Sequence, residues 1–150
     1  MISFERRYSM SKVAVVYWSG TGNTEAMANL VADGVKEAGG EPEVIEAVSF
    51  GPGDLGDYDA YAFGCPAMGD EELEEDEFEP MYDSVEPDVA ASKKKTALFG
   101  SFEWNDGDWM TYWKDRAVEH GVNIVDTAIA RDYPEDEAVD DCKKLGAALV

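Results

Sequence analysis

Apolar runs alternate with helical patterns along this chain of 150 residues. The segment KVAVVYW (12–18) is a short apolar run, as expected for a strand that is covered on both faces of a sheet. The segment EPEVIEA (41–47) carries more acids, which indicates a more exposed strand. The expected strands are 12–18, 41–47, 58–65, 94–101 and 122–130.

Between these runs, apolar residues recur at helical spacings. After the first strand, Leu30 and Val31 follow Met27 by three and four positions, and the pair Gly39 and Gly40 supplies a stop signal. The expected helices are 23–38, a short one near 78–85, 109–121 and 134–150. The expected loops are 50–57, the first part of 66–80, and 102–108.

This alternation predicts an α/β fold, in which a parallel sheet of five strands carries helices on both faces and right-handed crossovers connect the strands. The length suits one domain, which we expect over 12–150, with a flexible leader over 1–11. In such sheets ligands bind beyond the carboxyl ends of the strands. The loops at 18–24, 65–71 and 101–108 are therefore expected to converge on one site.

The stretch YWSGTGNT (17–24) lies between the first strand and its helix. A nucleotide P-loop needs a lysine after its last glycine, and a dinucleotide fingerprint needs a third glycine where this chain has Glu25. The loop instead offers hydroxyls, one amide and two glycines, and its members are Ser19, Gly20, Thr21, Gly22, Asn23 and Thr24. With the positive end of the following helix, this set predicts a cradle for one phosphate that is held without a countercharge. A plain turn would not require so many donors.

Two large side chains occupy the other loops. Met68 follows the third strand, and Trp104 follows the fourth. An indole is costly to expose, and a thioether makes favourable contacts with aromatic faces. The pair is therefore expected to enclose a planar ring, the alternative being that both side chains belong to the core.

The segments YWSGTGNTEAMA, CPAMGDEELEE and ALFGSFEWNDGDWM resemble flavodoxins, and specifically the short-chain flavodoxins of anaerobic bacteria. The resemblance covers nearly the whole chain from Lys12 to Val150. It implies a flavodoxin-like three-layer sandwich with the strand order 2-1-3-4-5. It also implies non-covalently bound FMN and a low-potential one-electron carrier, not an enzyme, that shuttles between semiquinone and hydroquinone.

The resemblance further implies the role of each loop. The six residues of the first loop would hold the phosphate, with Ser101 nearby, while Met68 and Trp104 would cover the two faces of the ring. The peptide after the Met68–Gly69 position would turn over on reduction, so that its carbonyl accepts a hydrogen bond from the flavin N5–H. Gly69 suits this because glycine costs little in either orientation. Glu71 would accept from the flavin N3–H. The remaining implied cofactor contacts are Pro66, Ala67, Asp70, Phe102, Glu103, Asn105, Asp106 and Gly107.

Two positions depart from the family pattern. Pro66 stands where such relatives often carry a small hydroxyl residue, so one contact to the cofactor is lost. Glu103 stands where they often carry a glycine, and its carboxylate either lowers the reduction potential or points to water. Both changes leave FMN binding as the expectation.

Two other functions compete with an electron carrier. One is a flavodoxin-like, FMN-dependent quinone or NAD(P)H reductase, which needs room over the ring for hydride transfer. Trp104 as a lid would fill that room, and the negative charge of the chain would repel NAD(P)H. The other is a module with this fold but without FMN, and the phosphate loop argues against that.

The charge is strongly negative, with 33 acidic and 12 basic residues and a net charge of −21. This charge argues against nucleic-acid binding, which needs a basic footprint, and for the same reason against binding to an anionic membrane surface. The excess of acid suits solubility, salt adaptation or steering of a basic partner. The acids cluster at 70–79, beside the expected site, and this distribution favours steering over a uniform solubilising coat. We expect partners with basic docking surfaces, and the resemblance implies ferredoxin or flavodoxin reductases and acceptor oxidoreductases.

Three further features bear on location and chemistry. No apolar run approaches the roughly 18 residues of a membrane span, and no signal peptide is visible, so we expect a cytoplasmic protein. We expect it to be a monomer. Cys65 and Cys142 match no metal or redox spacing. Cys65 is expected to be a small buried apolar residue, and Cys142 is expected to lie in a helix. His120 is expected at the C-terminal end of a helix, where the helix dipole favours a cation. We expect neither a metal site nor a catalytic residue.

Overall fold

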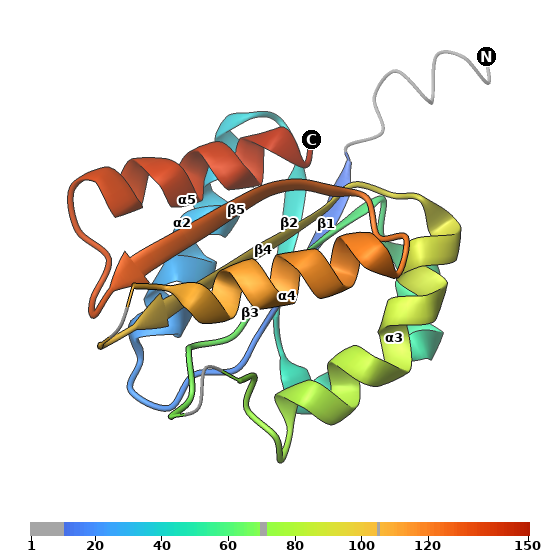
Figure 1. The fold of residues 1–150 in the computed structure, drawn as a ribbon. Helices are drawn as coiled ribbons and strands as arrows, with labels where there is room; N and C mark the ends of the chain where they lie inside the picture. The colour runs from blue at the N-terminus through green and yellow to red at the C-terminus, as the bar shows by residue number, and fades with distance from the viewer. Residues whose placement is uncertain (1–10, 70–71, 105) are drawn as a thin grey trace.

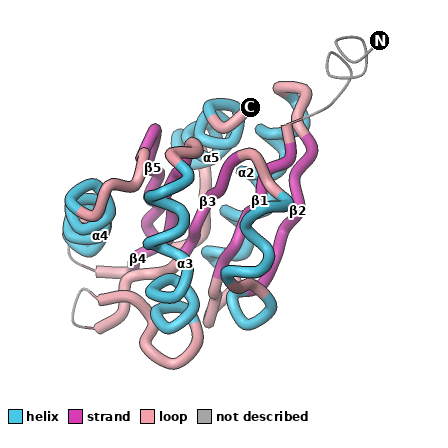
Figure 2. Tube along the Cα trace, turned by 90° about the vertical axis from the view of Figure 1, so that its right-hand side faces the viewer, coloured by secondary structure: helices cyan, strands magenta, loops and turns pink. Residues whose placement is uncertain are grey.

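The computed structural model describes residues 11–69, 72–104 and 106–150. Most of the expected leader therefore lies outside the described residues. Five parallel strands form one sheet in the order β2-β1-β3-β4-β5, which confirms the predicted fold class and order. The strands are β1 (Lys12–Tyr17), β2 (Glu41–Glu46), β3 (Ala60–Gly64), β4 (Thr96–Phe102) and β5 (Ile124–Arg131). Figure 2 shows them side by side, with β2 and β5 at the two edges.

The helices form the outer layers of a three-layer sandwich (Figure 1). They are α2 (Asn23–Glu37), α3 (Phe78–Ser92), α4 (Asp108–Glu119) and α5 (Glu137–Ala148). Val13 and Val15 on β1 pack with α2 and α5, whereas Ala14 and Val16 pack with α3 and α4. This alternation gives β1 two buried faces, as its apolar run predicts.

Helices α2 and α5 approach each other backbone to backbone. A Cβ added to Gly34 would overlap the carbonyl oxygen of Lys143, and one added to Gly146 would overlap the carbonyl oxygen of Val31. Each helix therefore presents a glycine to the main chain of the other. The absence of these two side chains allows the close contact.

The segment 50–57 is not the plain loop that the sequence predicts. Pro52–Asp57 forms a 3-10 helix, and another 3-10 turn precedes it at Ala47–Ser49. Pro52 suits a first turn because its missing N–H would have no partner there. The N–H of Gly51 donates to Asp54 Oδ2 at 2.9 Å, which fixes the start of the longer 3-10 helix.

Helix α3 is longer than predicted. It continues past Val85 to Ser92 with Pro87 in its interior, although proline removes a helix hydrogen bond. Val85 and Val89 lie one helical turn apart, and both are buried in the core beside α4. Burial of these side chains outweighs the local cost of the proline.

Glu74, within the acidic segment 70–79, is buried rather than solvated. Its carboxylate accepts hydrogen bonds at 2.8 Å from the backbone N–H groups of Asp76, Glu77 and Phe78, the last being the first residue of α3. A negative charge at this end of a helix is favourable because the free N–H groups there are positive. This acid therefore fixes the start of α3.

We predict that Glu74→Gln lowers the free energy of unfolding by about 2 kcal/mol, because a neutral amide accepts these backbone hydrogen bonds less strongly and cannot complement the dipole. Urea unfolding measures the change. Glu75→Gln removes the same charge from an exposed neighbour and should stay within about 0.5 kcal/mol of the parent. Equal losses in the two variants would contradict the capping role.

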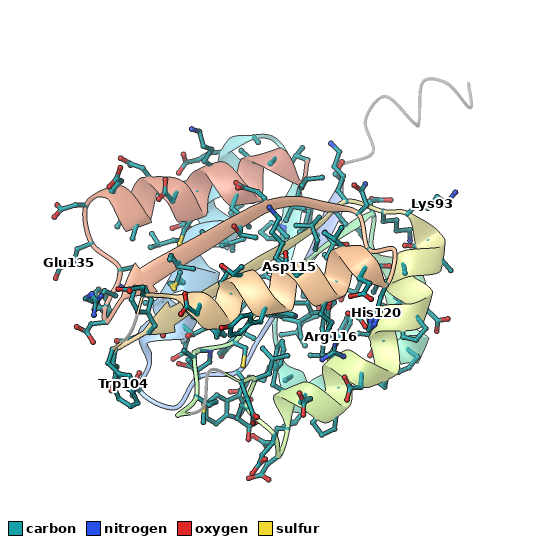
Figure 3. All side chains as sticks on the ribbon, viewed as in Figure 1. Lys93, Trp104, Asp115, Arg116, His120 and Glu135 are labelled. Carbon is teal, nitrogen blue, oxygen red and sulfur yellow. The ribbon has the colours of Figure 1, made fainter. Side chains whose placement is uncertain are left out.

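The sequence predictions for the two cysteines and for His120 are confirmed. Cys65 is free and buried, and Cys142, which is also free and buried, lies in α5. His120 ends α4, and its Nδ1 lies 2.6 Å from Oε1 of the buried Glu86. Figure 3 shows His120 and Arg116 together on the side of α4 that faces α3. No helix in the described part of the chain is long and apolar enough to cross a membrane.

Candidate cofactor site

Two adjoining hollows lie at the carboxyl ends of β1, β3 and β4, where the sequence predicts convergence of three loops. The first, of about 220 Å³, is lined by the three loops together. The second, of about 430 Å³, lies beside the first loop and α2. Trp18, Gly20 and Thr21 line both hollows and join them into one site.

The polar end of the site is the first loop. Gly22 has a φ of 97°, a left-handed conformation that favours glycine, and it leads into α2. Ser19 Oγ accepts from the N–H of Gly22 at 3.0 Å and from that of Glu25 at 3.3 Å. The loop thus places hydroxyls and the positive end of α2 in one place. No described residue that lines either hollow is a lysine or an arginine, so this donor set suits a phosphate held by dipoles.

Thr24 has a different position from the rest of this loop. It is buried, and its Oγ1 lies 2.8 Å from Ser101 Oγ and accepts from the N–H of Ser101 at 3.3 Å. Thr24 lines neither hollow. It joins the first turn of α2 to β4 and so positions the loop relative to the neighbouring strand.

The apolar end of the site is a crevice between the other two loops. Met68 and Trp104 both line it, together with Pro66, Ala67 and Phe102. Trp104 is 56% exposed and Met68 is only partly buried, so neither belongs to the core, which was the alternative. Figure 3 shows Trp104 at this end of the molecule, far from His120 and Arg116. The crevice can accept a flat, largely apolar ring.

Trp18 is a site residue that our sequence reasoning missed. Its indole lines both hollows, and its Nε1 donates to Glu77 Oε1 at 2.8 Å. The signal was present in the sequence, because this tryptophan directly precedes the phosphate loop at a strand end. Its contact with Glu77 connects the first loop to the acidic segment.

The structure brings together most of the site residues that the sequence predicts. Those lining the first hollow are Gly20, Thr21, Asn23, Pro66, Ala67, Met68, Gly69, Ser101, Phe102, Glu103 and Trp104. Ser19 and Gly22 line the second hollow. Asp106 and Gly107 line neither and lead into α4. The predictions for Asp70, Glu71 and Asn105 fall outside the described residues.

Tyr17 forms part of the wall of the second hollow and is 7% exposed. Its hydroxyl donates to Glu25 Oε2 at 3.0 Å. Burial, together with this hydrogen bond and the nearby carboxylates, raises the pKa of Tyr17 to about 12 from an ordinary value near 10. The neutral phenol is therefore favoured in the folded chain.

This shift predicts a loss of stability at high pH. The contribution of Tyr17 is fully present below about pH 10, where the unfolded side chain is also neutral, and it is lost as the pH rises towards 12. We expect Tyr17→Phe to unfold with a shallower dependence on pH between 10 and 12 than the parent in urea titrations. Tyr133→Phe, which changes a ring that is 60% exposed, serves as the control. Identical slopes for the parent and Tyr17→Phe would contradict the prediction.

The fold and the site define a class of protein: a doubly wound α/β domain whose phosphate-type loop adjoins a crevice for a flat ring. The comparisons with known proteins name the family. The sequence model of the flavodoxin family matches residues 15–146, which is most of the chain. The chain belongs to the flavodoxin family, whose members are FMN-binding electron carriers.

Similar proteins agree along nearly their whole length. A flavodoxin of Megasphaera elsdenii is 43% identical over 91% of this chain and 96% of its own, and one of Clostridium beijerinckii is 43% identical over 90% and 96%. The solution structure of the two-electron reduced Megasphaera elsdenii flavodoxin superimposes with a TM-score of 0.83, covering 91% of this chain and 97% of that one at 42% identity. These relatives support an electron-transfer protein rather than the quinone or NAD(P)H reductase.

Proposed function

We propose that FMN binds across the two hollows, with its phosphate in the loop Ser19–Thr24 and its ring between Met68 and Trp104. The observation that carries this assignment is a donor-rich loop without a cation beside an apolar crevice. When bound, FMN supplies a ring that accepts and returns single electrons. We assign the N5 edge of the ring to the backbone around Met68 and Gly69, and its pyrimidine edge to the backbone near Asp106 and Gly107. The domain that carries the cofactor spans 12–150, with 1–11 as a leader.

The chain's own charges favour a low reduction potential. Glu103 lines the first hollow, and Glu25, Glu46 and Glu77 line the second, without a lysine or arginine among the described lining residues. An added negative charge is resisted by these carboxylates, since two unit charges 4 Å apart repel by roughly 4 kcal/mol at an effective dielectric of 20. The apolar walls add to this resistance because they solvate charge poorly. The site therefore suits a low-potential donor.

The same charge suggests the partners. A net charge of −21 favours docking with proteins that present basic surfaces, and it disfavours self-association. We accordingly propose a cytoplasmic monomer that exchanges electrons with such proteins. In this role the residues of the site hold the cofactor, and no acid, base or nucleophile acts on a substrate.

Stepwise reduction with dithionite under argon tests the assignment of the cofactor. We expect a yellow protein whose absorbance changes in two separate one-electron steps, the second at a more negative potential than the first. A protein that takes up no FMN would overturn the binding proposal. A single two-electron step would instead favour the reductase chemistry.

Salt tests the docking proposal. The rate of electron transfer to a reductase with a basic surface should fall as ionic strength rises, because exposed charges are screened beyond about 10 Å at 0.1 M salt. Stopped-flow measurements with and without added NaCl give this rate. A rate independent of salt would remove the steering argument and leave solubility or salt adaptation to account for the acids.

A further inference from the structure

Arg131 lies at the edge of the site, and no function described so far uses it. It is the last residue of β5 and pairs in register with Phe102, the last residue of β4. Its guanidinium carbon lies 4.8 Å from the centroid of the Phe102 ring. Its Nη1 donates to the carbonyl oxygen of Glu103 at 3.0 Å. Both of these contacts are to residues that line the first hollow.

These contacts hold the start of the loop that carries Trp104. The carbonyl of Glu103 belongs to the peptide that leads into Trp104, and the N–H of Asp132 donates to the carbonyl of Phe102 at 2.8 Å. Trp104 itself is 56% exposed, so packing alone does not fix its position. The end of β5 thus holds the chain immediately before the indole through one side-chain and one backbone hydrogen bond.

Arg131, which is exposed, also places a positive charge against two residues that line an acidic site. A guanidinium over an aromatic face is attracted by the ring, and its planar fork donates at the same time. Lysine cannot reproduce both contacts, because its ammonium group is a compact point charge. Among the described residues that line the hollows the charged ones are all acids, so a cation in contact with Phe102 opposes their field.

We propose that Arg131 is a positioning residue that anchors the Trp104 loop and that its charge makes the second reduction step of the bound cofactor easier. The electrostatic part rests on the proposed function, whereas the anchoring part depends only on the chain. The carboxylates around the site oppose the second reduction step, and the positive charge of Arg131 favours it. The potential of that step therefore depends on both. The residue contacts the wall of the site and acts through Phe102 and Glu103.

Three variants separate these effects. Arg131→Met keeps an unbranched apolar side chain but removes the charge and the donor. Arg131→Lys keeps the charge but loses the stacked plane. Lys36→Met is the matched control, because it removes one positive charge from the last turn of α2, a helix of 15 residues that starts at the site and carries Lys36 roughly 20 Å away.

Two measurements are made on each full-length variant. The first is hydrogen exchange of the backbone at Trp104, Asp106 and Gly107, which requires no cofactor. The second is the equilibrium constant of the second reduction step in a spectroelectrochemical titration. If Arg131 only anchored the loop, its loss would change the exchange rates. The equilibrium constant of the second reduction step would then equal that of the Lys36→Met protein.

We expect Arg131→Met to exchange about fivefold faster in this loop, as the loss of one hydrogen bond implies. We also expect its second reduction constant to fall about fivefold, or roughly 40 mV, a tenfold change being about 59 mV for one electron. Arg131→Lys should recover the reduction constant and still exchange faster than the parent. Lys36→Met should change neither quantity by more than about twofold.

An Arg131→Met protein that matches Lys36→Met in both measurements would overturn the proposal. Faster exchange with an unchanged second constant would overturn the electrostatic part. If the parent chain takes up no FMN, the proposed function fails, and the exchange rates alone then decide whether Arg131 anchors the loop.

Discussion

Replacing Gly146 with alanine should lower the free energy of unfolding by about 3 kcal/mol, although alanine is the better helix former. In an open helix the same change would stabilise the chain by up to about 1 kcal/mol. Here the added methyl group would overlap the main chain of α2 at Val31. Backbone cannot move aside as a flexible side chain can, so α5 must shift away from α2.

The contact is reciprocal, which makes the prediction stronger. Gly34 on α2 meets the backbone of Lys143 on α5, one helical turn before Gly146. Separation of the two helices would loosen Val35 and Leu145, which are fully buried in the same core cluster. The loss of packing therefore adds to the steric cost.

Urea unfolding of Gly146→Ala, Gly34→Ala and Gly56→Ala tests this packing. An added Cβ at Gly56 would meet no atom within 4 Å, so that variant should stay within about 0.5 kcal/mol of the parent. Gly34→Ala should lose about as much as Gly146→Ala. A Gly146→Ala protein more stable than the parent would show that helix propensity, not the close approach, controls this position.

A carboxylate in the phosphate loop should have the largest effect on cofactor binding. We expect Thr21→Asp to weaken FMN binding by about 10³-fold. Thr21 is exposed, lines both hollows and lies in a loop without a cation. Repulsion of roughly 4 kcal/mol between charges 4 Å apart corresponds to about three powers of ten in the dissociation constant.

Thr21→Asn is the matched control, because it has nearly the same shape as aspartate and no charge. Quenching of flavin fluorescence gives the dissociation constants of all three proteins. Riboflavin, which lacks the phosphate, should bind to Thr21→Asp and Thr21→Asn with similar affinity. If Thr21→Asp lost no more FMN affinity than Thr21→Asn, the phosphate would not lie in this loop.

The sequence predicted those parts of the fold that depend on local pattern. The central strands β1, β3 and β4 are buried throughout most of their length, so their apolar runs identify them without knowledge of their neighbours. Likewise, glycines and hydroxyls between a strand and a helix mark the first loop. Met68 and Trp104 were identified because a large side chain in an exposed loop is costly unless it covers a ligand or packs into the core.

The features that were missed depend on tertiary partners. Glu74 has the same composition around it as its exposed neighbours, and only the fold shows that it turns inward to the start of α3. Helix α3 continues beyond Pro87 because Val89 is buried in the core. Local helix propensity does not predict this burial. The sequence pattern placed Trp18 at the end of a strand. Only the folded arrangement of the three loops shows that its side chain lines the site.

The site is assembled from three loops that are far apart along the chain, around residues 20, 68 and 104. A molecule that contacts all three binds the folded chain and has no such surface to bind in the unfolded one. By mass action, a ligand present at 100 times its dissociation constant therefore adds about 2.7 kcal/mol to the stability. Turnover of the protein by proteases acts on opened chains, so it should slow as the supply of FMN rises. The number of carriers in a cell would then follow the amount of cofactor available to fill them.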